Sequence, residues 1–122
     1  MAKGYWIAHI TVRDPEAYKE YGERDTPIIE GFGGPVEGLP TSNDPSEIQA
    51  KVRAAVDADP DVDTVLALGA SLAGEPTVAA IKAIGAIDEV RVASFDLSAN
   101  FLQSIVDGDA AFAIDQQQFL QG

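Results

Sequence analysis

The 122-residue chain is predicted to fold as one flavodoxin-like α/β domain, a three-layer α/β/α sandwich around a five-stranded parallel sheet in the order 2-1-3-4-5. Three observations predict this fold. Five short apolar runs are typical of buried strands, helical patterns alternate with them, and capping residues or glycines separate the two. The length suits a single domain, and alternating strands and helices imply parallel strands joined by right-handed crossovers.

The first strand and helix are predicted from residues 5–12 and from Pro15 onward. Both alternating faces of residues 5–12 are largely apolar, which is typical of a strand covered on two sides. Asp14 fits a helix N-cap and Pro15 the first helical position. Apolar positions then recur at helical spacing up to Gly33-Gly34, with a kink or restart expected at Pro27: Tyr18, Tyr21, Ile28, Ile29 and Phe32.

A short strand over residues 36–39 leads into the second predicted helix. Asp44 can cap this helix, and Glu47 can reach back to it in a capping box. The buried stripe of the helix is expected to consist of Ile48, Val52, Ala55 and Val56.

The third unit is a strand over residues 64–69 and a helix that carries Val78, Ile81 and Ile84 and ends at Gly85.

A fourth strand over residues 90–94 precedes a helix that Ser98 caps and Gly108 ends. Its inner face is expected to hold four apolar residues: Phe101, Leu102, Ile105 and Val106. Residues 110–114 are predicted to form the last strand, and residues 116–122 at most a helical stub.

Charge and composition narrow the classes of partner. The formal net charge is −12, from 20 acidic and 8 basic residues, so the chain should repel nucleic acid and anionic membranes. The absence of cysteine leaves the redox compartment open. The opening MAKGYWIAHI resembles neither a signal peptide nor a spanning helix, and we expect the chain to stay where it is made.

Two long motifs carry a resemblance from Pro35 to the end. They are LPTSNDPSEIQAKVRAAVDADPDVDTVLALGASLAGEP and VRVASFDLSANFLQSIVDGDAAFAIDQQQFLQG. In order and spacing they resemble the second lobe of a type I periplasmic sugar-binding protein that feeds an ABC transporter. The resemblance implies that Asp96 and Gln116 hydrogen-bond sugar hydroxyls, with the loop of Asn43 and Asp44 close by.

The first 34 residues resemble a different family. MAKGYWIAHITVRDPEAYKEY is similar to the opening strand and helix of an uncharacterised family in the dimeric α/β-barrel, ferredoxin-like group. A natural second lobe would not begin this way, and its closing helix would run past Gly122. The interpretation is a recombined or engineered chimera joined near Gly33-Gly34; the alternative is a natural protein whose N-terminus diverged.

A ligand of such a sheet would sit beyond the carboxyl ends of the strands. These ends are expected to converge at residues 11–14, 41–44, 69–71, 95–96 and 115–116. The resemblance also implies a weakened site, because the partner lobe is missing, Gly69 stands where the family often has Asn, and the Arg of the first βα unit is absent. The structural alternative is that Asp96 and Gln116 cap helices or are solvated.

No catalytic group is predicted. His9 lies in a strand without an evident partner, and the segment around Ser71 has Ala73 where a nucleophile elbow needs glycine. Trp6, Tyr5, Tyr18 and Tyr21 are expected to pack in the core. Neither phosphate-binding glycine motif occurs, so no phosphate cradle is predicted. We also expect no cofactor and no metal site.

Three functions remain as hypotheses. The first is a non-catalytic scaffold with at most a weak remnant of a sugar-binding edge, and the second is a minimal monosaccharide-binding lobe. The third is a small dimeric α/β-barrel protein, which predicts an antiparallel strand after the first helix. The chain is expected to be a monomer or a homodimer, with apolar surface left uncovered near Phe32, Val36, Phe119 and Leu120.

Overall fold

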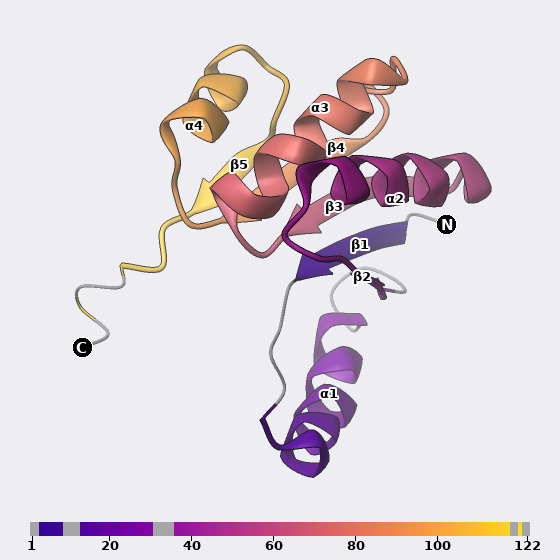
Figure 1. Ribbon diagram of the computed structural model, residues 1–122, viewed down its shortest axis with the longest axis vertical. Helices are drawn as coiled ribbons and strands as arrows, with labels where there is room; N and C mark the ends of the chain where they lie inside the picture. The colour runs from indigo at the N-terminus through magenta and orange to yellow at the C-terminus, as the bar shows by residue number, and fades with distance from the viewer. Residues whose placement is uncertain (1–2, 9–12, 31–35, 118–119, 121–122) are drawn as a thin grey trace.

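The computed structural model describes residues 3–8, 13–30, 36–117 and 120. Within them, one parallel sheet runs in the order β2-β1-β3-β4-β5 (Figure 1). Its strands are β1 (Lys3–Ala8), β2 (Val36–Pro40), β3 (Val62–Ala67), β4 (Arg91–Phe95) and β5 (Phe112–Ile114). The predicted strand order and the parallel direction are confirmed.

The described α-helices are α1 (Pro15–Glu30), α2 (Pro45–Ala58), α3 (Glu75–Ala83) and α4 (Ala99–Val106), with a π-helix, η1 (Ala70–Gly74), directly before α3. Three of the α-helices begin at the polar residues that the sequence marks as caps, whereas α3 begins after Gly74, which has no side-chain cap. Asp14 accepts the amides of Glu16 and Ala17, and Ser98 accepts that of Phe101. After α3 and α4 the chain turns at Gly85 and Gly108, whose positive φ angles of 71° and 84° suit glycine.

The hydrophobic core lies between the sheet and the layer formed by α2, α3 and α4. It includes the predicted residues Ile48, Val52, Val78 and Ile81, and the largest fully buried side chain is Phe101 of α4. In the part of the chain that the structure describes, no helix is long and apolar enough to cross a bilayer.

Helix α1 lies beyond the β2 edge of the sheet, at the end of the molecule away from α3 and α4 (Figure 1). It projects away from the sheet, and its main described contacts are with β2 (Figure 1). The second helical layer of the predicted three-layer sandwich therefore stays a prediction.

Three expectations about side chains are wrong. Tyr18 is 42% exposed rather than packed in the core, because α1 stands away from the sheet. Leu102 and Val106 are 42% and 79% exposed, since α4 is short and only its Phe101 and Ile105 side meets the core.

At the C-terminus, residues 116, 117 and 120 are not helical, which agrees with the expectation of at most a helical stub. The predictions for His9, Phe32 and Phe119, and for the side chains of Tyr5, Trp6, Tyr21 and Val36, lie outside the described residues.

Candidate ligand-binding edge

Asp96 and Gln116 follow the two last strands of the sheet, which are neighbours. Phe95 pairs with Ile114 at the carboxyl ends of β4 and β5, so Asp96 comes directly after one member of this pair and Gln116 two residues after the other. The amide of Asp96 donates a hydrogen bond of 2.9 Å to the carbonyl oxygen of Ile114. The fold thus brings these two predicted residues to one corner of the carboxyl edge, and both are half-buried.

The backbone of Asp96 is in the left-handed region, with φ at 64°. Non-glycine residues adopt this conformation rarely, although Asp tolerates it better than most, and it persists only where the surroundings hold it. Here the hydrogen bond to Ile114 holds it, and such outliers cluster at ligand sites. The conformation therefore marks Asp96 as a candidate binding residue on grounds independent of its sequence.

Asn43 and Asp44 lie at the carboxyl end of β2, and both are exposed. The carboxylate of Asp44 accepts the amide of Ser46 at 2.8 Å and so acts as the N-cap of α2. In the sheet, β1 and β3 stand between β2 and β4, a separation of roughly 14 Å at the usual strand spacing. The structure gives Asp44 its capping role and brings neither residue next to β4 in the sheet.

The predicted capping box is replaced by a different network around Glu47. One carboxylate oxygen of Glu47 accepts the hydroxyl of Ser42, and the other lies 2.8 Å from Nζ of Lys51. Ser42 in turn accepts the amide of Asp44, the donor that a capping box would have given to Glu47. Lys51 also donates to the carbonyl oxygen of Pro40 at 2.7 Å, so the network fixes the loop between β2 and α2.

These contacts change the acidity of Glu47. The hydrogen bond from Lys51, followed by that from Ser42, lowers the pKa of the Glu47 carboxyl from 4.5 to about 2. The carboxylate is therefore ionised at neutral pH and committed to holding the loop, not to proton transfer.

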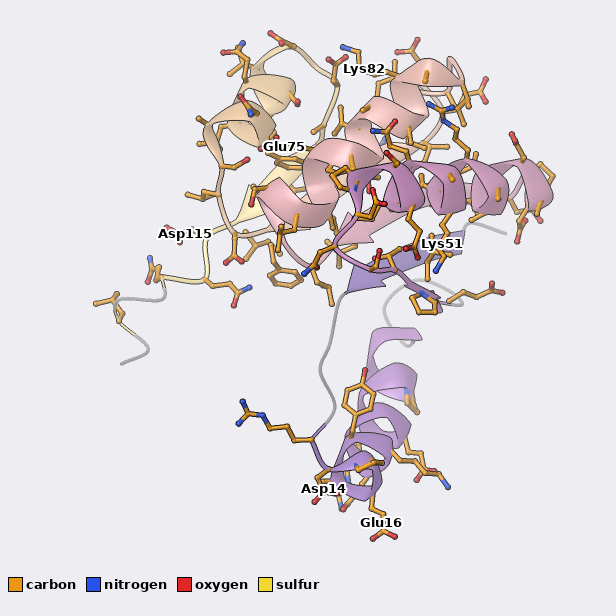
Figure 2. All side chains as sticks on the ribbon, in the orientation of Figure 1. Asp14, Glu16, Lys51, Glu75, Lys82 and Asp115 are labelled. Atoms are coloured by element: carbon orange, nitrogen blue, oxygen red, sulfur yellow. The ribbon has the colours of Figure 1, made fainter. Side chains whose placement is uncertain are left out.

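A second polar cluster, which the sequence reasoning missed, joins α3 to α4. The Glu75 carboxylate accepts the hydroxyl of Ser98 at 2.7 Å and the side-chain amide of Asn100 at 3.1 Å. Figure 2 shows Glu75 and Asp115 toward the end of the molecule to which the strands point, whereas Asp14 lies at the far end of α1. The sequence signal for this cluster was an acidic residue, Glu75, in the first turn of a helix. This signal does not reveal the partners of Glu75, because they lie 23 and 25 residues further along the chain.

The segment after β3 is also unlike a nucleophile elbow. It forms the π-helix η1, in which the amide of Gly74 donates to the carbonyl of Gly69 at 2.9 Å, and Ser71 is exposed on it. Leu72 of η1 and Leu97 of the loop after β4 are exposed large apolar residues at the same edge. The edge therefore combines carboxylates and amides with apolar side chains.

Comparison with known families gives one match over most of the chain. Residues 3–91 match the family described as "Domain of unknown function (DUF1330)". The chain belongs to the DUF1330 family. Its match extends far beyond residue 34, so in this DUF1330 protein the family signal is not confined to the predicted N-terminal piece.

Solved structures resemble this DUF1330 protein at low sequence identity. A periplasmic sugar-binding protein of an ABC sugar transporter from Legionella pneumophila has a TM-score of 0.73 and 21% identity, over 97% of this chain and 43% of its own. A carbohydrate transporter from Acidothermus cellulolyticus 11B, in complex with myo-inositol, has the same TM-score and identity, over 97% of this chain and 39% of its own. An ABC transporter periplasmic solute-binding protein from Actinobacillus succinogenes 130z with bound D-allose has a TM-score of 0.71 and 14% identity, over 97% of this chain and 41% of its own.

These likenesses show the fold, which is that of one lobe of such proteins, and the DUF1330 chain spans less than half the length of each. Because they cover 97% of this chain, they include residues on both sides of the predicted junction near residues 33–34. No curated protein matches this member of the family.

Proposed function

We propose that this protein is a non-catalytic α/β domain that binds a monosaccharide or cyclic polyol weakly at the carboxyl edge of its sheet. The observation that supports this most is the left-handed backbone of Asp96, tied to the end of β5 beside Gln116. A carboxylate accepts from two neighbouring hydroxyls, and a side-chain amide both donates and accepts. This pair suits the vicinal hydroxyls of a sugar ring.

The binding is proposed to be weak because this edge is half of an enclosure. The similar solved proteins are more than twice as long, and what this chain resembles is one of their lobes. A ligand that lies on an open edge remains largely hydrated, whereas ligand sites normally bury most of the ligand surface. We expect a dissociation constant of about 1 mM or weaker, equivalent to about −4 kcal/mol.

A recombined origin is part of the same proposal. The N-terminal residues resemble an α/β-barrel family, yet β2 pairs parallel to β1. The dimeric α/β-barrel hypothesis predicts an antiparallel strand at this place, so the strand direction is against it. A chimera in which the larger piece imposes a flavodoxin-like sheet accounts for the N-terminal resemblance and the parallel pairing. The family match over residues 3–91 crosses the proposed junction and lends this origin no support.

The proposal includes the absence of catalysis. Several carboxylates at this edge make structural hydrogen bonds: Asp44 caps α2, Glu47 holds Ser42 and Lys51, and Glu75 joins α3 to α4. A general base must instead reach a reacting proton and be free to accept it.

The test is a titration of the full chain, labelled with ¹⁵N, with D-allose, D-ribose and myo-inositol up to about 100 mM. Saturable amide shifts should concentrate at residues 95–98 and 114–117. Asp96→Ala should weaken them at least tenfold, since it removes the carboxylate acceptor. Asp57→Ala, which removes an exposed carboxylate of α2, is the matched control and should leave them unchanged.

Shifts that are absent or grow linearly up to the highest concentration would refute the binding proposal. Equal loss in the Asp96 and Asp57 variants would place binding elsewhere and refute the role of Asp96.

A further inference from the structure

Strand β5 lies at one end of the sheet and leaves an edge that no described strand pairs. It pairs with β4, and the amide of Ala111, directly before β5, donates to the carbonyl oxygen of Val92 at 2.7 Å. The backbone groups of successive strand residues point in turn to one side of the strand and to the other. The amides of Phe112 and Ile114 therefore point away from β4, toward the unpaired edge.

The two edges of the sheet differ in how they resist a further strand. Native edge strands resist it with proline, which has no N–H, and with charged side chains. The β2 edge carries both, because Glu37 and Pro40 are exposed on it. Strand β5 consists of Phe112, Ala113 and Ile114 and carries neither. Its edge thus has the composition of a strand that is paired on both sides.

One face of the sheet beside the β5 edge is apolar. Side chains alternate along a strand, and Ala113 packs toward the helices, so Phe112 and Ile114 point to the other face. Their exposed fractions are 53% and 39%. Phe95, which pairs with Ile114, continues this surface on β4 and is half-buried. A strand laid beside β5 would cover the exposed sides of Phe112 and Ile114.

The helical side of the same edge is also apolar. Asn100 of α4 donates to Glu75 of α3 at 3.1 Å, so the Asn100 flank of α4 faces α3. At about 100° per residue, Leu102 and Val106 lie about 160° and 120° around the helix from Asn100. Leu102 is 42% and Val106 79% exposed. Their flank faces away from α3, and α4 lies beyond α3 on the β5 side of the molecule (Figure 1), so both residues border the β5 edge.

The charges around this edge have one sign. Residues 92–122 contain no basic residue and four acidic residues: Asp96, Asp107, Asp109 and Asp115. Asp107 and Asp115 are exposed before and after β5, whereas Asp109 pairs with Lys82. A partner segment with basic residues at its two ends is therefore attracted to this edge. A second copy would bring the same acids, so charge opposes pairing between two β5 strands.

We propose that the unpaired edge of β5 binds an extended, cationic segment of a partner protein, which adds a further strand to the sheet. The backbone of the segment accepts the amides of Phe112 and Ile114, as in other cases of recognition by strand addition. Its apolar side chains cover Phe112 and Ile114 on one face and Leu102 and Val106 on the other. Its basic ends lie near the acidic residues that flank β5.

This inference does not rest on the proposed sugar binding. The amide of Asp96 is bonded to the carbonyl oxygen of Ile114 on the side of β5 that faces β4, whereas the partner segment takes the opposite side. Failure of the full chain to bind sugars therefore leaves strand addition intact, and failure to bind the partner segment leaves the Asp96 corner intact.

The test uses the peptide acetyl-KKVTVTVKK-amide, added to the ¹⁵N-labelled full chain up to about 1 mM. Saturable amide shifts should concentrate at residues 102–114. Solvent exchange of the Phe112 and Ile114 amides should slow about tenfold at saturation, because these amides gain acceptors. The amide of Ala111, which already donates to Val92, is the internal control and should change less.

Two control peptides separate charge from backbone pairing. The acidic peptide acetyl-EEVTVTVEE-amide has the same central residues and should bind at least tenfold more weakly. The cationic peptide methylated at every backbone nitrogen keeps the side chains but has no N–H, and its methyl groups block a strand pairing. It should leave the exchange rates of Phe112 and Ile114 unchanged.

A pair of charge variants tests the acidic flanks. Asp107→Asn with Asp115→Asn should raise the dissociation constant of the cationic peptide about fivefold, since it removes two exposed charge contacts. Asparagine at 115 keeps an oxygen that can accept the amide of Gln117. Asp61→Asn with Asp63→Asn makes the same change in net charge at exposed positions beside β3. At about 150 mM salt, where distant charges are screened, this control should bind like the wild type.

Four results would overturn the proposal. They are the absence of saturable shifts up to about 1 mM, equal binding of the acidic peptide, equal protection by the methylated peptide, and a Phe112 amide that is already protected in the chain alone. In the last case, protection that rises with protein concentration would identify a second copy at the edge, and constant protection would identify the chain itself.

Discussion

Gly74 is the last residue of η1, where the backbone passes close to the ring of Phe101. A Cβ atom at Gly74 would lie 2.9 Å from Cδ2 and Cε2 of Phe101 and 3.3 Å from Oγ of Ser94. These three atoms belong to two residues, Phe101 and Ser94, which are both fully buried and have little room to move. The residue is therefore needed for close approach and not for backbone freedom, because its φ of −63° is helical.

Gly74→Ala should destabilise the fold. Overpacking costs about 1–3 kcal/mol and outweighs the gain of up to about 1 kcal/mol that alanine brings to a helical position. We expect a net loss of about 1–2 kcal/mol in the free energy of unfolding by urea. Gly69→Ala is the control, since a Cβ there meets nothing within 4 Å in an extended backbone, and it should change stability little. Equal stability of Gly74→Ala and wild type would show that Phe101 moves aside freely.

At the scale of elements, polar networks decide how the helices meet the carboxyl edge. Glu47 joins the first turn of α2 to Ser42 in the preceding loop and to Lys51 one turn later. Glu75 joins α3 to the N-cap residue of α4. Asp44 and Ser98 thus act as local caps, as their positions in the sequence predict, whereas the carboxylates at 47 and 75 connect neighbouring elements.

The Glu47 network predicts a pH effect with a definite sign. The folded-state pKa of the Glu47 carboxyl, about 2, lies below its ordinary value of 4.5. The contribution of Glu47 to stability is therefore complete above about pH 4.5 and is lost as the pH falls toward 2. The stability difference between wild type and Glu47→Gln should shrink across this window, whereas the difference for Glu89→Gln, an exposed acid, should change less. NMR titration of the Glu47 carboxyl should give a midpoint near pH 2; a midpoint near 4.5 would contradict the network.

At the scale of the whole molecule, stability depends on the net charge and on how the helices cover the sheet. The chain places helices α2–α4 on one face of a parallel sheet and carries a net charge of −12. The described ion pairs are all at least partly exposed, for example Lys82 with Asp109, and such pairs offset little of that repulsion.

Salt should therefore stabilise the protein. Raising sodium chloride from about 10 to 200 mM shortens the screening length from about 30 Å to under 10 Å and weakens the self-repulsion. We expect the melting temperature of a dilute, monomeric sample to rise by about 2–5 °C. A variant with Asp61 and Asp63 changed to Asn should melt higher in low salt and respond less. A melting temperature that falls with salt would mean that the surface ion pairs dominate.

The sequence alone determined the alternation of strands and helices, the parallel order of the sheet, the caps at Asp14, Asp44 and Ser98, and the choice of Asp96 and Gln116 as neighbours at one edge. The elements and their caps depend on hydrogen bonds within a few residues and on periodicity, both of which are local. The strand order was expected from the alternation of strands and helices, and Asp96 and Gln116 were chosen from the resemblance to sugar-binding lobes. Tertiary structure alone decided the contact of Gly74 with Phe101, the bonds of Glu75 to α4, the exposure of Leu102 and Val106, and the uncovered Phe112 and Ile114. A helical or strand pattern shows which side of an element is apolar, but how much of that side is covered depends on the position of every neighbouring element.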